Sequence, residues 1–245
     1  MIKRIIIDGK ESVKLVKAQN TPIGDYDVAI CVKSCGICGS DLNFFRIGGL
    51  TPEMIGIPLN IGHEFSGEVE EVGKKLTDVN IGDRVFINPA TGGNIGFGGV
   101  EGAFCPRVVV KNAAFGFNLH KLPDEIPFHL GALIEPLNVG KHAVDRSNPK
   151  PGDKIFVIGA GPIGLAVLAS LVYRGFDEVV ISDLSDYRLQ VAKQIGAGTT
   201  INPTNEDVWS KLMELHGESE FFGEKFLGTD LFIEASGAPI IEDLI

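Results

Sequence analysis

The sequence predicts an α/β protein with two domains, a β-rich first domain followed by a doubly wound parallel sheet. Short apolar runs punctuated by Gly and Pro fill the first half of the chain. A break follows at Asn148-Pro149-Lys150-Pro151-Gly152, and beyond it strand-like and helix-like segments alternate. Such alternation is typical of a parallel sheet whose strands are joined by helices. We therefore place the domains at residues 1–148 and 149–245.

In the first domain, runs rich in β-branched residues predict four short strands, at Val28–Val32, Gly67–Val72, Arg84–Ile87 and Arg107–Val110. The segment Thr91–Gly102 is rich in Gly, and we expect a surface loop there.

In the second domain, apolar runs of strand length alternate with longer segments of helical character. The expected strands are Lys154–Ile158, Glu178–Asp183, Thr199–Ile201 and Asp230–Glu234, and the expected helices are Pro162–Arg174, Ser185–Ile195 and Glu206–Leu215.

Composition excludes several classes of partner. The net charge of −10 argues against nucleic acid or an anionic membrane, because both would repel such a surface. The uncharged run from Ile155 to Tyr173 is long enough to span a bilayer, but its glycines and Pro162 divide it into a strand and a helix. The chain starts without the apolar core of an export signal, so we expect a cytoplasmic protein. Its four cysteines are then metal ligands or buried thiols rather than disulfides.

A G-x-G-x-x-G motif predicts a dinucleotide site. It occupies residues 159–164, where an expected strand meets an expected helix, which is the context that gives the motif meaning. The free N–H groups at the helix start would hold a pyrophosphate. Asp183 ends the next strand, where a carboxylate binds the ribose hydroxyls and repels a 2′-phosphate, so NAD is favoured over NADP. The alternative is a tightly packed glycine turn with a solvated Asp183.

A second motif, Cys35-Gly36-Ile37-Cys38, permits three interpretations. A redox pair normally opens a helix in a thioredoxin-like unit, and half of a structural zinc site would need a second close cysteine pair. A catalytic zinc site would use one cysteine, one histidine and a carboxylate, and His63-Glu64 and Glu135 follow further along the chain.

The segments CGICGSD, GHEFSGEVEEVG, GDRV, EPLNVG and GAGPIG occur in this order. In this respect the chain resembles the zinc-dependent medium-chain alcohol dehydrogenases, especially their polyol (sorbitol-type) and threonine dehydrogenase branches. The resemblance implies a GroES-like catalytic domain followed by a Rossmann domain, in a homo-oligomer. It also implies reversible hydride transfer between NAD and a secondary alcohol, either a small polyol or a hydroxy-amino acid.

The resemblance also assigns roles to residues. Cys38 and His63 match zinc ligands, and Ser40 matches the hydroxyl that starts a proton relay. Glu64 and Glu135 each match an acid that either binds the metal or lies beside it. Cys35 does not match a ligand, and we expect it to be a packed thiol. The expected cofactor-binding residues are Gly159, Gly161, Pro162, Ile163, Gly164, Asp183 and Arg188.

Three departures from the family pattern matter. Between Pro89 and Arg107 the chain has only Cys105, so we expect one catalytic zinc and no structural zinc. Asn43 stands where several relatives have a relay histidine. The chain stops soon after LFIEASG, and residues 238–245 are too few for another helix and strand, so we expect an incomplete Rossmann domain. Two alternatives remain, a metal-free quinone or enoyl reductase of the same fold and a non-catalytic NAD-binding fragment.

Overall fold

The computed structural model describes residues 1–238, and it forms two compact units that divide between Glu135 and Pro136. Helix α3 (Ile134–Ser147) crosses this division, and most of it belongs to the second unit. Its Val144 is buried in the same cluster as Val167 and Leu171. The structure therefore divides the chain at the start of this helix, whereas the predicted boundary lies after its end.

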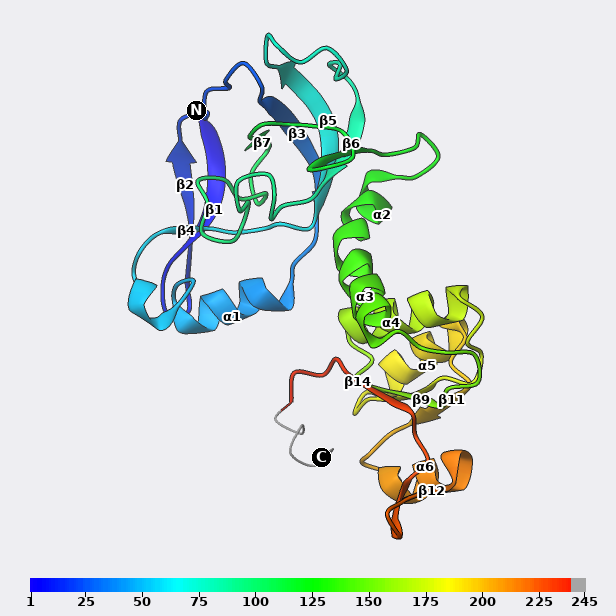
Figure 1. The fold of residues 1–245 in the computed structure, drawn as a ribbon. Helices are drawn as coiled ribbons and strands as arrows, with labels where there is room; N and C mark the ends of the chain where they lie inside the picture. Colours follow the sequence, from blue (N-terminus) through cyan, green and yellow to red (C-terminus); the bar gives the residue numbers. More distant parts are fainter. Residues whose placement is uncertain (239–245) are drawn as a thin grey trace. The chain divides into compact units, whose positions relative to one another are not determined.

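The first unit is β-rich, as predicted (Figure 1). An antiparallel sheet has the order β7-β3-β5-β6-β8, and a smaller antiparallel sheet has the order β2-β1-β4. The larger sheet contains β3 (Val28–Cys35), β5 (Phe65–Val72), β6 (Arg84–Ile87), β7 (Arg107–Val110) and β8 (Leu119–Lys121). The smaller sheet contains β1 (Ile2–Gly9), β2 (Ser12–Ala18) and β4 (Leu59–Asn60). Helices α1 (Gly39–Ile47) and α2 (Phe128–Ala132) and the 3₁₀ turn η1 (Pro52–Met54) complete the unit.

The four strands predicted in the first half are confirmed as β3, β5, β6 and β7. The expectation for Thr91–Gly102 is only partly right. The segment contains no helix or strand, but it is not confined to the surface. Ile95 is fully buried in the main core of the unit, so the segment is a packed loop whose glycines let its backbone approach neighbouring chain closely.

The second unit is a doubly wound parallel sheet, as predicted. Its strand order is β11-β10-β9-β14, and every pairing is parallel. The strands are β9 (Ile155–Ile158), β10 (Val180–Ser182), β11 (Thr199–Ile201) and β14 (Leu231–Glu234), and besides α3 the helices are α4 (Pro162–Tyr173), α5 (Asp186–Ile195) and α6 (Val208–His216).

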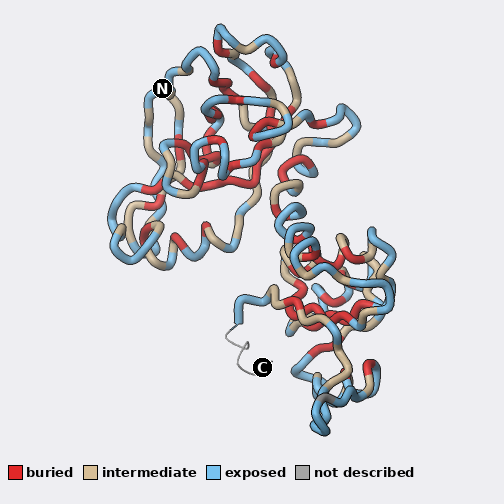
Figure 2. The backbone as a smooth tube through the Cα atoms, in the orientation of Figure 1, coloured by how far each residue is buried: buried red, intermediate tan, exposed pale blue. Residues whose placement is uncertain are grey.

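Strand β9 shows why helices must cover both faces of this sheet. Its side chains alternate, so Ile155 and Val157 enter one apolar cluster with α3, α4 and α5. Phe156 and Ile158 enter the other cluster, which contains Leu212 of α6. Figure 2 shows buried residues concentrated along the strands of this unit.

A hairpin interrupts the predicted alternation of strands and helices. Strands β12 (Glu218–Phe221) and β13 (Glu224–Leu227) pair between α6 and β14. Positive φ angles at Phe222 and Gly223 give the two-residue turn that joins twisted antiparallel strands most readily.

The expectations about a membrane span and about the end of the chain have different outcomes. Within residues 1–238, none of the helices combines the length and the apolar character that crossing a bilayer requires. The expectation about the end of the chain concerns residues 238–245, of which 239–245 lie outside the described part.

Candidate metal and nucleotide sites

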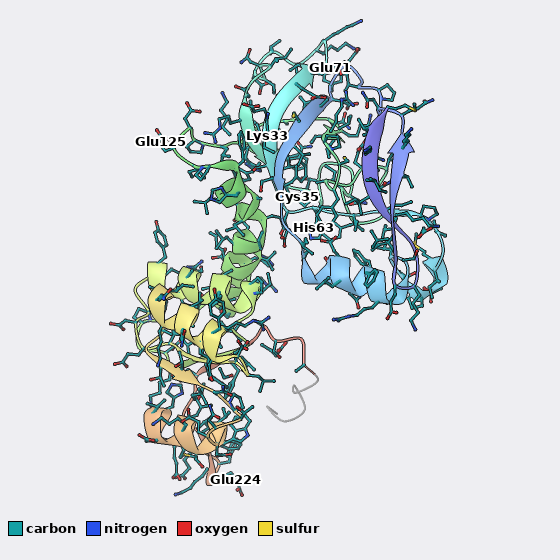
Figure 3. All side chains as sticks on the ribbon, turned by 180° about the vertical axis from the view of Figure 1, so that it is seen from behind. Lys33, Cys35, His63, Glu71, Glu125 and Glu224 are labelled. Atoms are coloured by element: carbon teal, nitrogen blue, oxygen red, sulfur yellow. The ribbon has the colours of Figure 1, made fainter. Side chains whose placement is uncertain are left out.

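Two loops of the first unit bring three predicted metal ligands together. Cys38 is the residue directly before α1, and His63 and Glu64 directly precede β5. Candidate ligand atoms of all three residues lie within 4.8 Å of one another. Figure 3 shows His63 and the neighbouring Cys35 at the end of β3 where the chain continues into α1. The backbone N–H of Gly36 donates to the carbonyl of Glu64 over 2.7 Å, which fastens the two loops together.

Asp41 holds both ligand loops, although sequence reasoning gave it no role. One carboxylate oxygen accepts a hydrogen bond from the N–H of Cys38 at 2.9 Å, and the other accepts one from the N–H of Gly62 at 3.2 Å. Its Oδ1 also lies 3.7 Å from Nδ1 of His63. The side chain is buried, so these contacts are little weakened by water. Its position at the third residue of α1 is a common capping position, and that was the available signal.

Burial disfavours the charged forms of the titratable side chains in this site. Burial lowers the pKa of His63, although the nearby Asp41 opposes this, and burial raises the pKa of both Cys38 and Glu64. Burial also raises the pKa of Glu135 to about 7, and the charge of Glu64 adds to the effect. A thiol and carboxyls that are costly to ionise in the absence of a cation are readily ionised beside one.

This donor set fits zinc. Thiolate sulfur, imidazole nitrogen and carboxylate oxygen are the ligands found in catalytic zinc sites. Within residues 1–238, the buried Nδ1 of His63 and Oγ of Ser40 have no hydrogen-bond partner. Buried polar atoms are nearly always paired, so the hydroxyl of Ser40 indicates that the site is completed by another molecule or ion, whereas Nδ1 of His63 faces Asp41.

The remaining candidates of this site differ in position. Cys35 packs against the main core of the unit, and its thiol points to the carbonyl of Gly36 at 3.5 Å. Burial raises the pKa of Cys35, and it does not belong to the three-residue group. Glu135, in the first turn of α3, is also outside that group but is close enough for its charge to interact with Glu64.

The predicted nucleotide residues gather at the carboxyl ends of β9 and β10. A side chain at Gly164 would place its Cβ 1.8 Å from the carbonyl oxygen of Gly159, so only glycine fits where α4 packs on this turn. At Gly161 a Cβ would meet no atom within 4 Å. The space over Gly161 is therefore open to a ligand, while Pro162 and Ile163 form the first turn of α4 beside it.

Asp183 is fixed beside this turn rather than solvated. Its Oδ2 accepts a hydrogen bond from the N–H of Ala160 at 2.8 Å, and its Oδ1 accepts one from the N–H of Ser185 at 2.8 Å. A guanidinium nitrogen of Arg188 lies 3.5 Å from Oδ2. The Asp183 side chain is only 9% exposed, so the sequence alternative of a solvated aspartate does not describe it.

Comparison with known proteins identifies the class. Residues 24–124 match the GroES-like domain of alcohol dehydrogenases. The chain is 37% identical over 239 residues to (R,R)-butanediol dehydrogenase of Bacillus subtilis, covering 87% of this chain and 64% of that protein. It is 36% identical over 245 residues to sorbitol dehydrogenase of Gallus gallus, covering 90% of this chain and 68% of that protein.

A solved structure agrees with these relatives. The crystal structure of 2R,3R-butanediol dehydrogenase from Bacillus subtilis superposes with a TM-score of 0.81 at 31% identity, covering 98% of this chain and 72% of that one. The chain belongs to the zinc-type medium-chain alcohol dehydrogenases, on their polyol side, which confirms the predicted resemblance. This family depends on zinc and on NAD or NADP. The chain spans about 64% of the length of the butanediol dehydrogenase that it matches.

Proposed function

We propose that the protein is a zinc-dependent dehydrogenase that transfers hydride between a small secondary alcohol, of the diol or polyol class, and NAD. The observation that carries this proposal is the convergence of the half-buried Cys38 with the buried His63 and Glu64. Two of the relatives are named as dehydrogenases of butanediol and of sorbitol, and this supports the substrate class.

We assign the metal to Cys38, His63 and Glu64, with Glu135 as the adjacent acid. Glu64 is preferred as the ligand because its carboxylate lies within 4.8 Å of both other donors, whereas Glu135 is outside the group. When bound, zinc supplies Lewis-acid polarisation of the alcohol oxygen. Ser40 supplies a buried hydroxyl without a partner in the described chain, which suits it to accept the proton of the substrate hydroxyl.

The nucleotide half of the proposal rests on Gly161 and Asp183. The start of α4 presents free backbone N–H groups beside the open position at Gly161, as a pyrophosphate requires. Asp183 is held at the adjoining strand end, where its charge would accept ribose hydroxyls and repel a 2′-phosphate. NAD is therefore the expected cofactor.

The test combines metal content with substrate turnover. We expect one zinc per chain, lost in Cys38→Ser and largely kept in Cys35→Ser, which is the matched control three residues away. The intact protein should oxidise secondary diols with NAD and discriminate against NADP. A wild-type protein without stoichiometric zinc would contradict the proposal. Zinc lost from Cys35→Ser but retained by Cys38→Ser would reverse the ligand assignment.

A further inference from the structure

We infer that Phe97 is a positioning residue that sets the ring orientation of His63, and that a buried ion pair between Arg4 and Glu101 fixes the loop that carries it. The inference rests on the proposed function, because it concerns His63 as a metal ligand. Arg4 lies in the N-terminal strand β1, and Phe97 and Glu101 lie in a glycine-rich loop. Neither segment carries a proposed metal ligand.

The ring of Phe97 contacts the ring of His63 directly. Their centroids are 4.0 Å apart, with the planes inclined by 35°. A metal-binding histidine is usually oriented by a hydrogen bond from its second ring nitrogen. Within residues 1–238, Nδ1 of His63 makes none, and the Asp41 oxygen facing it is 3.7 Å away. Packing against Phe97 is therefore a direct contact that restrains the imidazole.

The loop around Phe97 is docked on the segment that presents His63. The N–H groups of Ala103 and Phe104 donate to the carbonyls of Gly62 and Ile61 over 2.8 and 3.1 Å. On the other side of Phe97, a Cβ at Gly96 would lie 2.5 Å from the carbonyl oxygen of Gly62. Only glycine permits this approach, so the two backbones lie against each other on both sides of the ring contact.

Arg4 of β1 contacts the same loop through its guanidinium group. One guanidinium nitrogen lies 3.0 Å from a carboxylate oxygen of Glu101, and the other donates to the carbonyl of Val100 at 3.0 Å. Asn60 donates to the same carbonyl at 2.9 Å. The N–H of Gly96 donates to the backbone carbonyl of Glu101 at 2.8 Å, which closes the loop around Phe97.

The Arg4–Glu101 pair is better suited to fixing position than to adding stability. The two side chains are 9% and 6% exposed, and Arg4 Nε and Glu101 Oε1 have no hydrogen-bond partner in the described chain. A buried pair with polar atoms left unsatisfied recovers little of its desolvation cost. Its geometric effect is to hold Val100 and Glu101, and through them Phe97, against the His63 segment.

The test compares Phe97→Leu with Phe86→Leu. Phe86 also stacks on a histidine, His120, with centroids 4.9 Å apart, but this pair joins β6 and β8 and includes no proposed ligand. Both phenylalanines are partly buried, so the two variants remove similar packing. Zinc affinity would be measured by chelator competition, and the ligand geometry by the visible absorption of the cobalt-substituted protein.

We expect Phe97→Leu to weaken zinc binding by about 10-fold, the lower end for losing a group that orients a ligand, and to shift the cobalt spectrum. Phe97→Tyr, which keeps the aromatic ring, should retain the zinc affinity and the cobalt spectrum of the wild type. Phe86→Leu should change neither the affinity nor the spectrum. Glu101→Gln should shift affinity and spectrum in the same direction as Phe97→Leu.

Three results would overturn the inference. If Phe97→Leu matches Phe86→Leu in affinity and spectrum, the ring does not position His63, although the proposed function stands. If only Glu101→Gln is silent, the ion pair does not hold the loop. A wild-type protein that binds neither metal removes the proposed function and this inference together.

Discussion

Replacing Glu135 with Gln should stabilise the metal-free protein above neutral pH. The folded-state pKa of Glu135 is raised from 4.5 to about 7, mainly by burial and secondly by Glu64. Below pH 4.5 the carboxyl is protonated in both the folded and the unfolded chain, so its contribution to stability is then at its greatest. As the pH rises from 4.5 to about 7 that contribution is lost, because the unfolded chain releases its proton at a lower pH than the folded chain does.

The size of the effect follows from the pKa difference. A shift from 4.5 to about 7 corresponds to roughly 3 kcal/mol, and partial exposure of the side chain reduces this to about 2 kcal/mol. Gln is neutral at every pH and avoids the loss. Glu135→Gln should therefore exceed wild type in unfolding free energy by about 2 kcal/mol at pH 8 and equal it near pH 4.5.

The assay must report on the first unit. The single tryptophan of the chain, Trp209, is in α6 of the second unit, so its fluorescence would follow the wrong transition. Amide hydrogen exchange of β5, measured with a chelator present, reports the relevant opening. Glu125→Gln is the matched control, because Glu125 is exposed in the loop before α2 (Figure 3). Added zinc should cancel the advantage of Glu135→Gln, since a nearby cation favours the carboxylate.

Equal protection of Glu135→Gln and wild type at pH 8 would refute this reasoning, as would an advantage that does not change with pH. Either result would mean that the carboxyl group of Glu135 remains well solvated in the folded protein.

Three further predictions concern the supports of the two sites. Asp41→Ala should lower the unfolding free energy by about 3 kcal/mol and weaken zinc binding, because two N–H groups lose a charged acceptor; denaturant unfolding that matches wild type would contradict this. Asp183→Ser should weaken the binding of NAD by roughly 10-fold or more and reduce the preference for NAD over NADP. If titrations show an unchanged ratio of the two affinities, the carboxylate does not face the ribose. Gly164→Ala should destabilise the second unit by about 2–3 kcal/mol through a backbone clash, whereas Gly161→Ala should fold normally and lose nucleotide affinity; calorimetry and nucleotide titration that show the two variants alike would reject the distinction.

Local sequence signals account for much of the fold. Apolar runs such as Arg107–Val110 became buried strands, and the Gly-Pro turn at the start of α4 became the expected strand-to-helix junction. These elements follow from side-chain period and turn chemistry, which act over a few residues. The β12–β13 hairpin was not predicted, because its strands are short and charged. Its two-residue turn, Phe222-Gly223, has positive φ angles at both residues, but only the glycine pointed to a turn in the sequence.

The candidate metal site could be predicted from the sequence only in part. Residue types and the family resemblance gave Cys38, His63 and Glu64, which the structure brings together from separate loops. Periodicity could not show that Asp41 joins those loops or that Phe97 packs on His63, because such contacts depend on how distant segments meet. The glycines of Thr91–Gly102 predicted a surface loop, whereas in the folded chain they allow close backbone contact.

The hydrogen bond between Ala160 and Asp183 constrains how the cofactor preference of this protein could be exchanged. The carboxylate that would select NAD is also the acceptor that holds the glycine turn to the end of β10. A substitution that admits a 2′-phosphate therefore also leaves the Ala160 N–H without its acceptor and loosens the turn that contacts the pyrophosphate. Conversion to NADP should consequently require at least two changes, one that removes the negative charge and one that supplies a new acceptor for Ala160. Variants selected for NADP use are expected to acquire the second change in the segment that follows β10, where Ser185 already contacts Asp183.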